Sequence, residues 1–393
     1  MNITFLLRLW PVYGGGETVT ICLANEMIKR GWNVSVLYFK NNTRADLPFI
    51  DPAIKAVQIP DIRCDEFTTR FPDADKVTGY LKEYIQENDI HYLVNQWWPV
   101  EYIRGIRGRY KTKIVTCLHQ ALYTPMIEGT GINGFLKKRC TSLYKFWKKR
   151  HSCRQVTRFL PHTDKYIFLS PAFQRQYEQF SNYKNTNSQL GAIPNPLVYP
   201  NEIRPEDLQS KEKTVLLVGR MVEIQKRITL AIKIWSAIEN DPRLDEWNFR
   251  IVGEGPDLAM YKQLAQTLGL KRISFEGFRN PQPYYKQAAI FMMTSAFEGF
   301  PMTLVEAQQC GVVPVVMDSY LSLHDIVETG YNGIIVSNED LTGYVNKIKE
   351  LMTDTSLREK LAMNGLHSCR RFCVEEIVNN WEELFNDLSA NRR

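Results

Sequence analysis

The chain has 393 residues, of which 44% are hydrophobic and 23% are charged, and its formal net charge is +6. This composition is typical of globular proteins and excludes collagen-like, low-complexity and disordered chains. The length exceeds what one ordinary hydrophobic core needs, so we expect two domains. No stretch of the sequence approaches the roughly 18 uninterrupted apolar residues of a membrane span.

The chain opens with a short apolar run over residues 3–9, which Arg8 interrupts. No small-residue cleavage site follows, so a secretory signal peptide is only the minor alternative. We interpret the run as a first buried strand and expect a cytoplasmic protein.

Eight cysteines are spread along the chain and form no paired C-x-x-C metal pattern. Free thiols in a reducing compartment fit this distribution best. Cys369 and Cys373 are four residues apart, a spacing that predicts one face of a helix and not a zinc site.

The first half has the pattern strand, glycine-rich loop, helix, strand. The glycines at 14–16 separate the first strand from a helix predicted over 17–30, which Gly31 ends, and a second strand follows at 34–39. Strands that alternate with helices predict a parallel sheet covered on both faces. Further buried strands are expected at 92–94, 114–118 and 166–169.

Prolines punctuate the middle of the chain and divide it into two domains. We place a linker at 196–211, between an N-terminal Rossmann-like domain, 1–195, and a C-terminal one, 212–374. The amphipathic C-terminal helix at 375–393 is expected to pack back on the first domain.

The second half repeats the α/β pattern. Its strands are expected at 214–218, 248–252, 273–276, 289–293 and 312–317, and its helices at 228–238, 258–268 and 302–309. We expect two α/β sheets that face each other, with the ends of their strands lining one cleft.

The strongest chemical pattern lies between residues 295 and 307, where a strand gives way to a helix near Pro301. The free N–H groups and the dipole of a helix start favour an anion such as a pyrophosphate. Glu298 precedes the helix and Glu306 lies in its second turn, and carboxylates accept hydrogen bonds from sugar hydroxyls. A capping acid plus a solvated glutamate is the alternative interpretation of this pair.

Six short fragments, each weak alone, occur along the chain in one order. They are Gly14-Gly15-Gly16-Glu17, Ile193-Pro194-Asn195-Pro196, Val218-Gly219-Arg220 with Gln225-Lys226-Arg227, Gly253-Glu254-Gly255-Pro256, Phe275-Glu276-Gly277-Phe278, and Glu298-Gly299-Phe300-Pro301 with Glu306-Ala307. Together they resemble glycosyltransferase family 4, of GT-B fold, through most of the chain. The resemblance implies a retaining, metal-independent enzyme that uses a nucleotide-diphosphate sugar.

The resemblance implies catalytic roles for four residues. Arg220 and Lys226 would neutralise the diphosphate leaving group, so that neither a divalent metal nor another cofactor is needed. Glu298 would hold hydroxyls of the transferred sugar, and His119 would reach that sugar from the first domain. The implied donor-binding residues are Glu306 for the ribose, together with Gly299, Phe300, Pro301, Met302, Gly15, Gly16, Gly253 and Phe278.

The sequence departs from the family pattern at three places. Arg227 follows Lys226 where glycine is commoner, and Gln120 follows His119 where the family often has an aspartate, which leaves the histidine without its usual orienting partner. The loop at 318–325 also differs, so no contact from it can be carried over.

A basic stretch lies between Gly129 and Thr163, where nine cations occur without one acid, so the rest of the chain sums to −3 (6 − 9). Aromatic residues alternate with these cations over 135–158. This composition predicts contact with an anionic membrane surface; nucleic acid and a solvated basic face are the alternatives. We expect a peripheral protein on the inner face of the cytoplasmic membrane and no nucleic-acid partner.

The function implied is transfer of a hexosyl group to a hydroxyl of a glycan or lipid-linked glycan, in surface polysaccharide or lipopolysaccharide synthesis. A GT-B sugar-nucleotide epimerase or hydrolase and a non-catalytic nucleotide-sugar binding protein are the alternatives. A dinucleotide dehydrogenase is disfavoured, because Val19 stands where a third glycine is required. Asp73 and Asp75 match a metal-binding triplet of another glycosyltransferase fold, but an acid-rich helix start explains them better.

Overall fold

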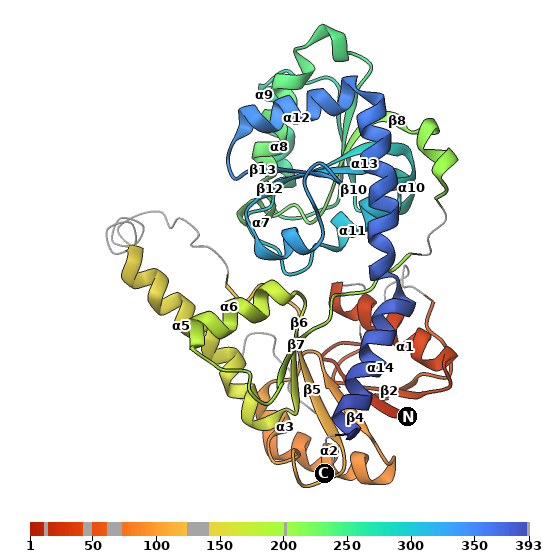
Figure 1. Cartoon of the computed structure of the whole chain (residues 1–393), viewed down its shortest axis with the longest axis vertical. Coiled ribbons are helices and arrows are strands. Elements are labelled where there is room, and N and C mark those ends of the chain that lie inside the picture. The colour runs from red at the N-terminus through yellow and green to blue at the C-terminus, as the bar shows by residue number, and fades with distance from the viewer. Residues whose placement is uncertain (12–14, 42–48, 61–72, 124–140, 200–202, 391–393) are drawn as a thin grey trace. The chain divides into compact units, whose positions relative to one another are not determined.

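The computed structural model describes the chain except for residues 12–14, 42–48, 61–72, 124–140, 200–202 and 391–393 (Figure 1). The chain forms two compact units. Unit 1 comprises the described residues of Met1–Tyr123, Glu128–Val198 and Cys373–Arg393, and unit 2 those of Tyr199–Phe372. Both units are α/β with a parallel sheet, which is the predicted fold class.

Unit 1 is built on a seven-stranded parallel sheet with the order β3-β2-β1-β4-β5-β6-β7. The strands are β1 (Asn2–Leu6), β2 (Asn33–Tyr38), β3 (Lys55–Gln58), β4 (Tyr92–Asn95), β5 (Lys113–Leu118), β6 (Lys165–Phe168) and β7 (Leu190–Ala192). The described helices are α1 (Gly15–Lys29), α2 (Ala74–Glu87), α3 (Val100–Ile103), α5 (Thr141–Phe159), the 3-10 turn η1 (Leu160–His162), α6 (Pro171–Ser181) and α14 (Val374–Ala390).

Side chains of the central strand β1 belong alternately to two hydrophobic clusters. Ile3 and Phe5 pack with residues of α1 and α14, whereas Leu6 packs with Val77 and Leu81 of α2. This alternation is what a pleated strand covered on both faces requires. Helix α2 begins at Ala74, so Asp73 and Asp75 lie at a helix start, as predicted.

The C-terminal helix α14 packs beside α1 in unit 1 (Figure 1). Its apolar face, which includes Trp381 and Phe385, joins the cluster around β1. Tyr92 Oη donates to the carbonyl oxygen of Phe385 at 2.7 Å, and Arg30 Nη1 lies 3.2 Å from Glu382 Oε2. The last segment of the chain therefore completes the hydrophobic core of the first unit.

Unit 2 is built on a six-stranded parallel sheet with the order β10-β9-β8-β11-β12-β13. The strands are β8 (Glu212–Val218), β9 (Asn248–Val252), β10 (Ile273–Gly277), β11 (Ala288–Met293), β12 (Val313–Asp318) and β13 (Ile334–Ser337). The helices are α7 (Glu223–Lys226), α8 (Ile228–Glu239), α9 (Leu258–Thr267), α10 (Gln282–Gln287), α11 (Met302–Gln309), α12 (Leu341–Thr353) and α13 (Thr355–Ser368). Four 3-10 turns complete it: η2 (Pro205–Ser210), η3 (Pro242–Leu244), η4 (Leu321–Asp325) and η5 (Cys369–Phe372).

The expectation for Cys369 and Cys373 is wrong. Cys369 opens the 3-10 turn η5, and Cys373 lies outside it, just before α14. The chain passes from unit 2 to unit 1 between these two residues. A tighter turn at this passage breaks the α-helical register, so the four-residue spacing does not give one helix face.

Candidate active site

The strand order of unit 2 reverses between β8 and β11, which are paired at the middle of the sheet. In open parallel sheets, ligands bind beyond the carboxyl ends of the strands at such a switch point. Gly219 and Arg220 follow β8, and Glu298 follows β11 by five residues. The fold therefore brings the residues implied for the diphosphate and for the sugar to one edge of one sheet.

The loops that follow β8 and β9 are in direct backbone contact. Gly219 N donates to Val252 O at 3.0 Å, and Met221 N donates to Glu254 O at 2.8 Å. Gly253 has a φ of +139°, and a Cβ there would lie 2.0 Å from the Gly219 carbonyl oxygen. Glycine is needed at 253 for this approach, which fixes the path of the loop that carries Arg220.

Lys226 and Glu298 form a largely buried ion pair at the switch point. Lys226 Nζ lies 2.6 Å from Glu298 Oε1, and the two side chains are 14% and 8% exposed. Gln225 Nε2 donates to Glu298 Oε2 at 3.3 Å, and Arg220 Nη2 donates to Gln225 Oε1 at 3.3 Å. Since an ammonium group has three donors, Lys226 can hold Glu298 and still donate to a phosphate oxygen.

Arg227 explains how the chain does without the commoner glycine after Lys226. Its φ is +48°, in the left-handed region that favours glycine. Its guanidinium donates from Nε to Thr294 O at 2.7 Å and from Nη2 to Ser295 O at 2.9 Å. The side chain thus ties the α7 turn to the loop after β11, and this tie fixes Lys226 beside Glu298.

Glu306 lies in the second turn of α11 and is buried. Tyr285 Oη of α10 donates to Glu306 Oε2 at 3.0 Å. Burial raises the pKa of the Glu306 carboxyl to about 7, against a smaller opposing effect of the tyrosine hydrogen bond. The residue implied for the ribose is therefore a carboxyl close to half-protonated at neutral pH.

The other implied donor-binding residues differ in what they can offer a ligand. The Phe300 ring is buried against Phe372, with centroids 5.4 Å apart, so its side chain serves packing and only its backbone is available. Pro301 is the N-cap of α11 and Met302 its first residue, as the helix predicted over 302–309 requires. Phe278 follows β10 with half of its side chain exposed, which suits stacking on a nucleotide base.

A second cluster of implied residues lies in unit 1, at the carboxyl ends of β4 and β5. Gly15 is the first residue of α1, and Gly14 lies outside the described residues. A Cβ at Gly16 would lie 2.9 Å from Trp97 Cζ2, so glycine allows the indole to pack on the start of α1. The indole in turn stacks on the His119 ring, with centroids 5.0 Å apart and an interplanar angle of 30°.

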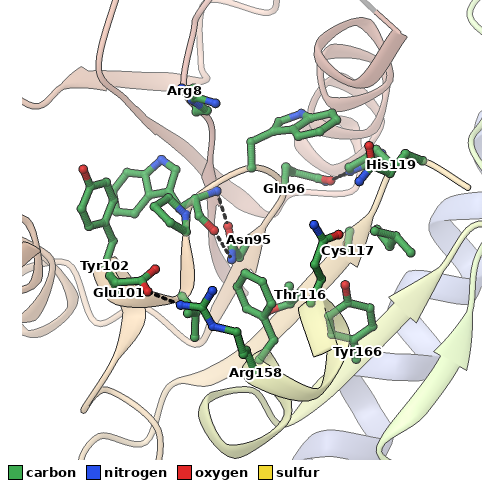
Figure 2. A pocket seen from close by; sticks show the side chains of 18 of the residues that line it. Arg8, Asn95, Gln96, Glu101, Tyr102, Thr116, Cys117, His119, Arg158 and Tyr166 are labelled. Carbon is green, nitrogen blue, oxygen red and sulfur yellow. Dashed lines mark hydrogen bonds and ion pairs between the residues drawn. The ribbon is translucent and has the colours of Figure 1, made fainter. Parts of the chain in front are cut away.

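His119 has an orienting partner that the sequence did not indicate. Its Nε2 is hydrogen-bonded to Oε1 of Gln96, which follows β4 (Figure 2). Burial lowers the pKa of His119 to about 4, so the imidazole is neutral at physiological pH. Gln96 therefore orients His119, the role for which the sequence offered no partner because Gln120 stands where the family often has an aspartate.

A cavity of about 310 Å³ opens beside this cluster within unit 1 (Figure 2). Its size is at the lower end of small-ligand pockets. Arg8, the ion pair of Arg158 with Glu101, and the polar groups of Gln96 and His119 line it. Aromatic rings also line it, namely Phe39, Trp97, Trp98, Tyr102, Phe159 and Tyr166.

The residues that sequence reasoning missed share one property. Each contacts an implied site residue that lies far away in the sequence. Gln96 and Trp97 contact His119, Gln225 contacts Glu298, and Tyr285 contacts Glu306. Gln225 had a usable signal, because it stands next to Lys226 in the implied phosphate-binding segment. Gln96 had a weaker one, since it lies two residues after the strand predicted at 92–94, while His119 directly follows the strand predicted at 114–118.

The basic stretch is only partly described. Lys137, Lys138 and Arg139 lie outside the described residues, and α5 carries the rest. Phe146 and Trp147 are each 56% exposed on α5. Within the described ranges no helix is both long and apolar enough to cross a bilayer, and no three His, Cys, Asp or Glu side chains there gather as a metal site.

Two family models match the chain in succession. The model of "Glycosyltransferase Family 4" matches residues 13–197, and that of "Glycosyl transferases group 1" matches residues 199–367. The two matches together cover most of the chain and meet where unit 1 passes into unit 2.

Relatives of known activity and known structure match over nearly the full length. An undecaprenol-linked glycan α-1,4-N-acetyl-D-galactosaminyltransferase of Campylobacter jejuni is 22% identical over 396 residues, 99% of each chain. A lipopolysaccharide 1,6-galactosyltransferase of Escherichia coli is 26% identical over 357 residues, 89% of each chain.

A similar solved structure is that of HepE from Anabaena in complex with UDP and glucose. It is 18% identical, with a TM-score of 0.70, and the match covers 98% of this chain and 100% of that one. The fold is thus that of the GT-B enzymes, and the two family matches agree with the two sheets described above. The chain belongs to the glycosyltransferases of GT-B fold, with a family 4 domain followed by a group 1 domain.

Proposed function

We propose that this enzyme transfers a sugar from a nucleotide-diphosphate sugar to a hydroxyl of a glycan or lipid-linked glycan, with retention of the anomeric configuration. The observation that carries the proposal is the meeting of Arg220, Gln225, Lys226 and Glu298 at the switch point of the unit 2 sheet. Two cations suit a diphosphate, and the carboxylate beside them suits sugar hydroxyls.

In the proposed reaction, Arg220 and Lys226 stabilise the diphosphate as it leaves, and Glu298 holds the hydroxyls of the transferred sugar. The acceptor hydroxyl attacks from the face that the diphosphate leaves, so the configuration is retained. The leaving phosphate takes the proton of that hydroxyl, so we assign no side chain as general base. Glu306 accepts hydrogen bonds from the ribose.

The relatives support the class of substrates. HepE was solved with UDP and glucose, and the two full-length relatives transfer galactose or N-acetylgalactosamine to lipopolysaccharide or to an undecaprenol-linked glycan. By analogy we propose a role in the synthesis of a surface polysaccharide or lipopolysaccharide. The cavity of unit 1, with aromatic walls beside polar groups, suits a sugar of the acceptor.

The proposal is tested by thermal shift with UDP, GDP, ADP and their sugars. One nucleotide is expected to raise the melting temperature of the wild type, and Arg220→Ala or Glu306→Ala should abolish that shift. Arg243→Ala is the matched control. It removes a cation of unit 2 that is 83% exposed, on the turn before β9 and so at the opposite edge of the sheet. Binding that survives in the Arg220 and Glu306 variants contradicts the site.

Two further readouts test the chemistry. Transfer should continue in a chelating buffer, because Arg220 and Lys226 supply the positive charge; a strict need for Mg²⁺ or Mn²⁺ contradicts this. The anomeric configuration of the product, read by NMR, should equal that of the donor sugar. Turnover of the donor without any acceptor product favours the hydrolase or epimerase alternative.

We also propose that α5 contacts an anionic membrane surface. Phe146 and Trp147 are exposed together, with ring centroids 6.3 Å apart, beside the cations of the same helix. Lys148 and Lys149 already lie over the rings of Tyr123 and Phe180, so part of the positive charge has partners within unit 1. Exposed aromatic groups with adjacent cations suit an interface of apolar chains and anionic headgroups.

The membrane proposal is tested by flotation with vesicles. Binding is expected with vesicles that contain phosphatidylglycerol, not with pure phosphatidylcholine, and Phe146→Ser with Trp147→Ser should weaken it at least several-fold. Phe49→Ser, at a residue 74% exposed elsewhere in unit 1, is the matched control. Equal binding of all variants, or binding to RNA in place of vesicles, overturns the assignment.

A further inference from the structure

Gln96 and His119 are brought together by the register of two neighbouring strands. Asn95 of β4 pairs with Thr116 of β5, so the residues that follow both strands emerge at the same edge of the sheet. The backbone of Gln96 is held by a hydrogen bond from its N–H to Leu6 O at 3.2 Å. Its side chain is 3% exposed and ends on the imidazole (Figure 2).

This contact selects one form of the histidine. A side-chain carbonyl oxygen only accepts hydrogen bonds, so His119 Nε2 carries the hydrogen and Nδ1 carries the lone pair. Gln96 is also uncharged, and it does not favour the imidazolium as a carboxylate would. Burial lowers the pKa of His119 further, to about 4.

Two polar atoms of the cluster are enclosed and have no hydrogen-bond partner among the described residues: His119 Nδ1 and Trp97 Nε1. Leaving such an atom without a partner costs about 1–3 kcal/mol, so we expect each to bond to a group that the described residues do not supply. One atom is an acceptor and the other is a donor, on rings that stack on each other. A hydroxyl group, which both donates and accepts, is complementary to this pair.

We propose that Gln96 is a positioning residue, which holds His119 as a neutral Nε2–H imidazole so that Nδ1 accepts a hydrogen bond from a sugar hydroxyl and Trp97 Nε1 donates to the same oxygen. The inference rests on the proposed function. His119 then acts as a fixed hydrogen-bond acceptor and does not transfer a proton.

The charged and titratable groups that line the cavity with His119 come from five elements or their ends. They are Arg8 after β1, Glu101 and Tyr102 of α3, Cys117 of β5, Arg158 of α5 and Tyr166 of β6. Burial alone accounts for the lowered pKa of His119. A new charge at position 96 should therefore dominate any change in its titration.

The test is the ¹⁵N spectrum of the six histidines in the free protein, with His119 assigned by its absence in His119→Ala. The wild type should show His119 as neutral Nε2–H from pH 5 to 8. Gln96→Glu should raise its pKa by at least one pH unit, because a carboxylate favours the imidazolium. Gln96→Met should remove the tautomer preference, and Gln120→Met, the matched control, should leave it unchanged.

The spectrum overturns the inference if His119 is charged at pH 7, is the Nδ1–H tautomer, or is the same in Gln96→Met as in the wild type. Release of UDP from UDP-galactose, UDP-N-acetylgalactosamine or UDP-glucose is the second readout. Gln96→Met should lower turnover roughly 10- to 100-fold with the affinity for UDP alone unchanged. The spectrum decides the inference even if no UDP-sugar is turned over, and that absence in the wild type counts against the proposed function alone.

Discussion

Glu306 is a buried carboxyl whose only hydrogen-bond partner in the described contacts is a neutral phenol, Tyr285. Its pKa of about 7 lies well above the ordinary 4.5, because burial disfavours the charged form. The folded protein therefore binds more protons than the unfolded chain between these two values. The contribution of this group to stability is present below pH 4.5 and is lost as the pH rises through 7.

We expect the free energy of unfolding of the wild type, relative to Glu306→Gln, to fall by roughly 3 kcal/mol between pH 4.5 and pH 8. The glutamine variant keeps the size and a hydrogen-bonding group but does not titrate. Urea unfolding of both proteins across this pH range is the measurement. Parallel pH curves for the two proteins would show that Glu306 does not titrate as its burial requires.

The ion pair of Lys226 and Glu298 should be strongly coupled. Removing one partner leaves the other charge buried, so Lys226→Met or Glu298→Gln alone should cost about 3 kcal/mol of stability. The double variant should cost clearly less than the sum of the two. A double-mutant cycle by urea unfolding measures this coupling.

The exposed pair of Lys213 and Glu246, 53% and 68% exposed in the same unit, is the control for that cycle. Its coupling should stay below about 1 kcal/mol, because solvent screens it. If the losses of stability in the Lys226 and Glu298 variants were additive, the two side chains would not be coupled as an ion pair, and the prediction would be wrong.

At the scale of single residues, the sequence indicated the charged groups of the site but not their partners. Arg220, Lys226 and Glu298 stand in recognisable local patterns, next to strands and glycines. Gln96 and His119 lie 23 positions apart, and only the register of β4 and β5 brings them together. Such pairs follow from the folded sheet and have no local signature.

At the scale of elements, α7 depends on one residue in an unfavourable conformation. Arg227→Gly should relieve about 1 kcal/mol of left-handed strain, but it removes two hydrogen bonds from a charged donor, each contributing about 1.5–3 kcal/mol. The net result should be a loss of stability of roughly 2 kcal/mol or more, with weaker binding of UDP. Urea unfolding and calorimetry measure the two effects, and an Arg227→Gly variant as stable as the wild type would rule out the tie to Thr294 and Ser295.

Two elements whose bounds the sequence predicted correctly adjoin a clear boundary residue, Gly253 after the strand and Pro301 before the helix. The predicted strand at 248–252 and helix at 302–309 agree with β9 and α11 to the residue. Strand β3 was not predicted because its residues are largely exposed at the edge of the sheet. Strand β7 was not predicted because it has only three residues. A helix was expected within the basic stretch, but the many cations of α5 leave no apolar periodicity from which its bounds could be predicted.

At the scale of the whole molecule, the last helix of the chain belongs to the core of the first unit. Phe385 is fully buried and stacks on Tyr92 of β4, with centroids 4.2 Å apart. Phe385→Ala should therefore destabilise unit 1 by about 3–5 kcal/mol, while UDP affinity stays unchanged, because the implied diphosphate residues lie in unit 2. Unfolding followed by tryptophan fluorescence, with UDP titration of the folded protein, checks both parts.

Phe49→Ala is the control for this variant, since that ring is 74% exposed and should matter by less than about 0.5 kcal/mol. A Phe385→Ala protein as stable as the control would mean that α14 is not needed by the first unit. The sequence anticipated this packing from the apolar face and terminal position of the helix. It could not identify Tyr92 as the partner, because that contact spans 293 residues.

A crystal structure of the enzyme with UDP would show whether the nucleotide binds at the switch point of the unit 2 sheet. We expect the diphosphate within hydrogen-bond distance of Arg220 and Lys226 Nζ, beyond the carboxyl ends of β8 and β11, with the ribose hydroxyls on Glu306. A nucleotide bound away from this edge of the unit 2 sheet, or bound there without contact to either cation, would contradict this expectation.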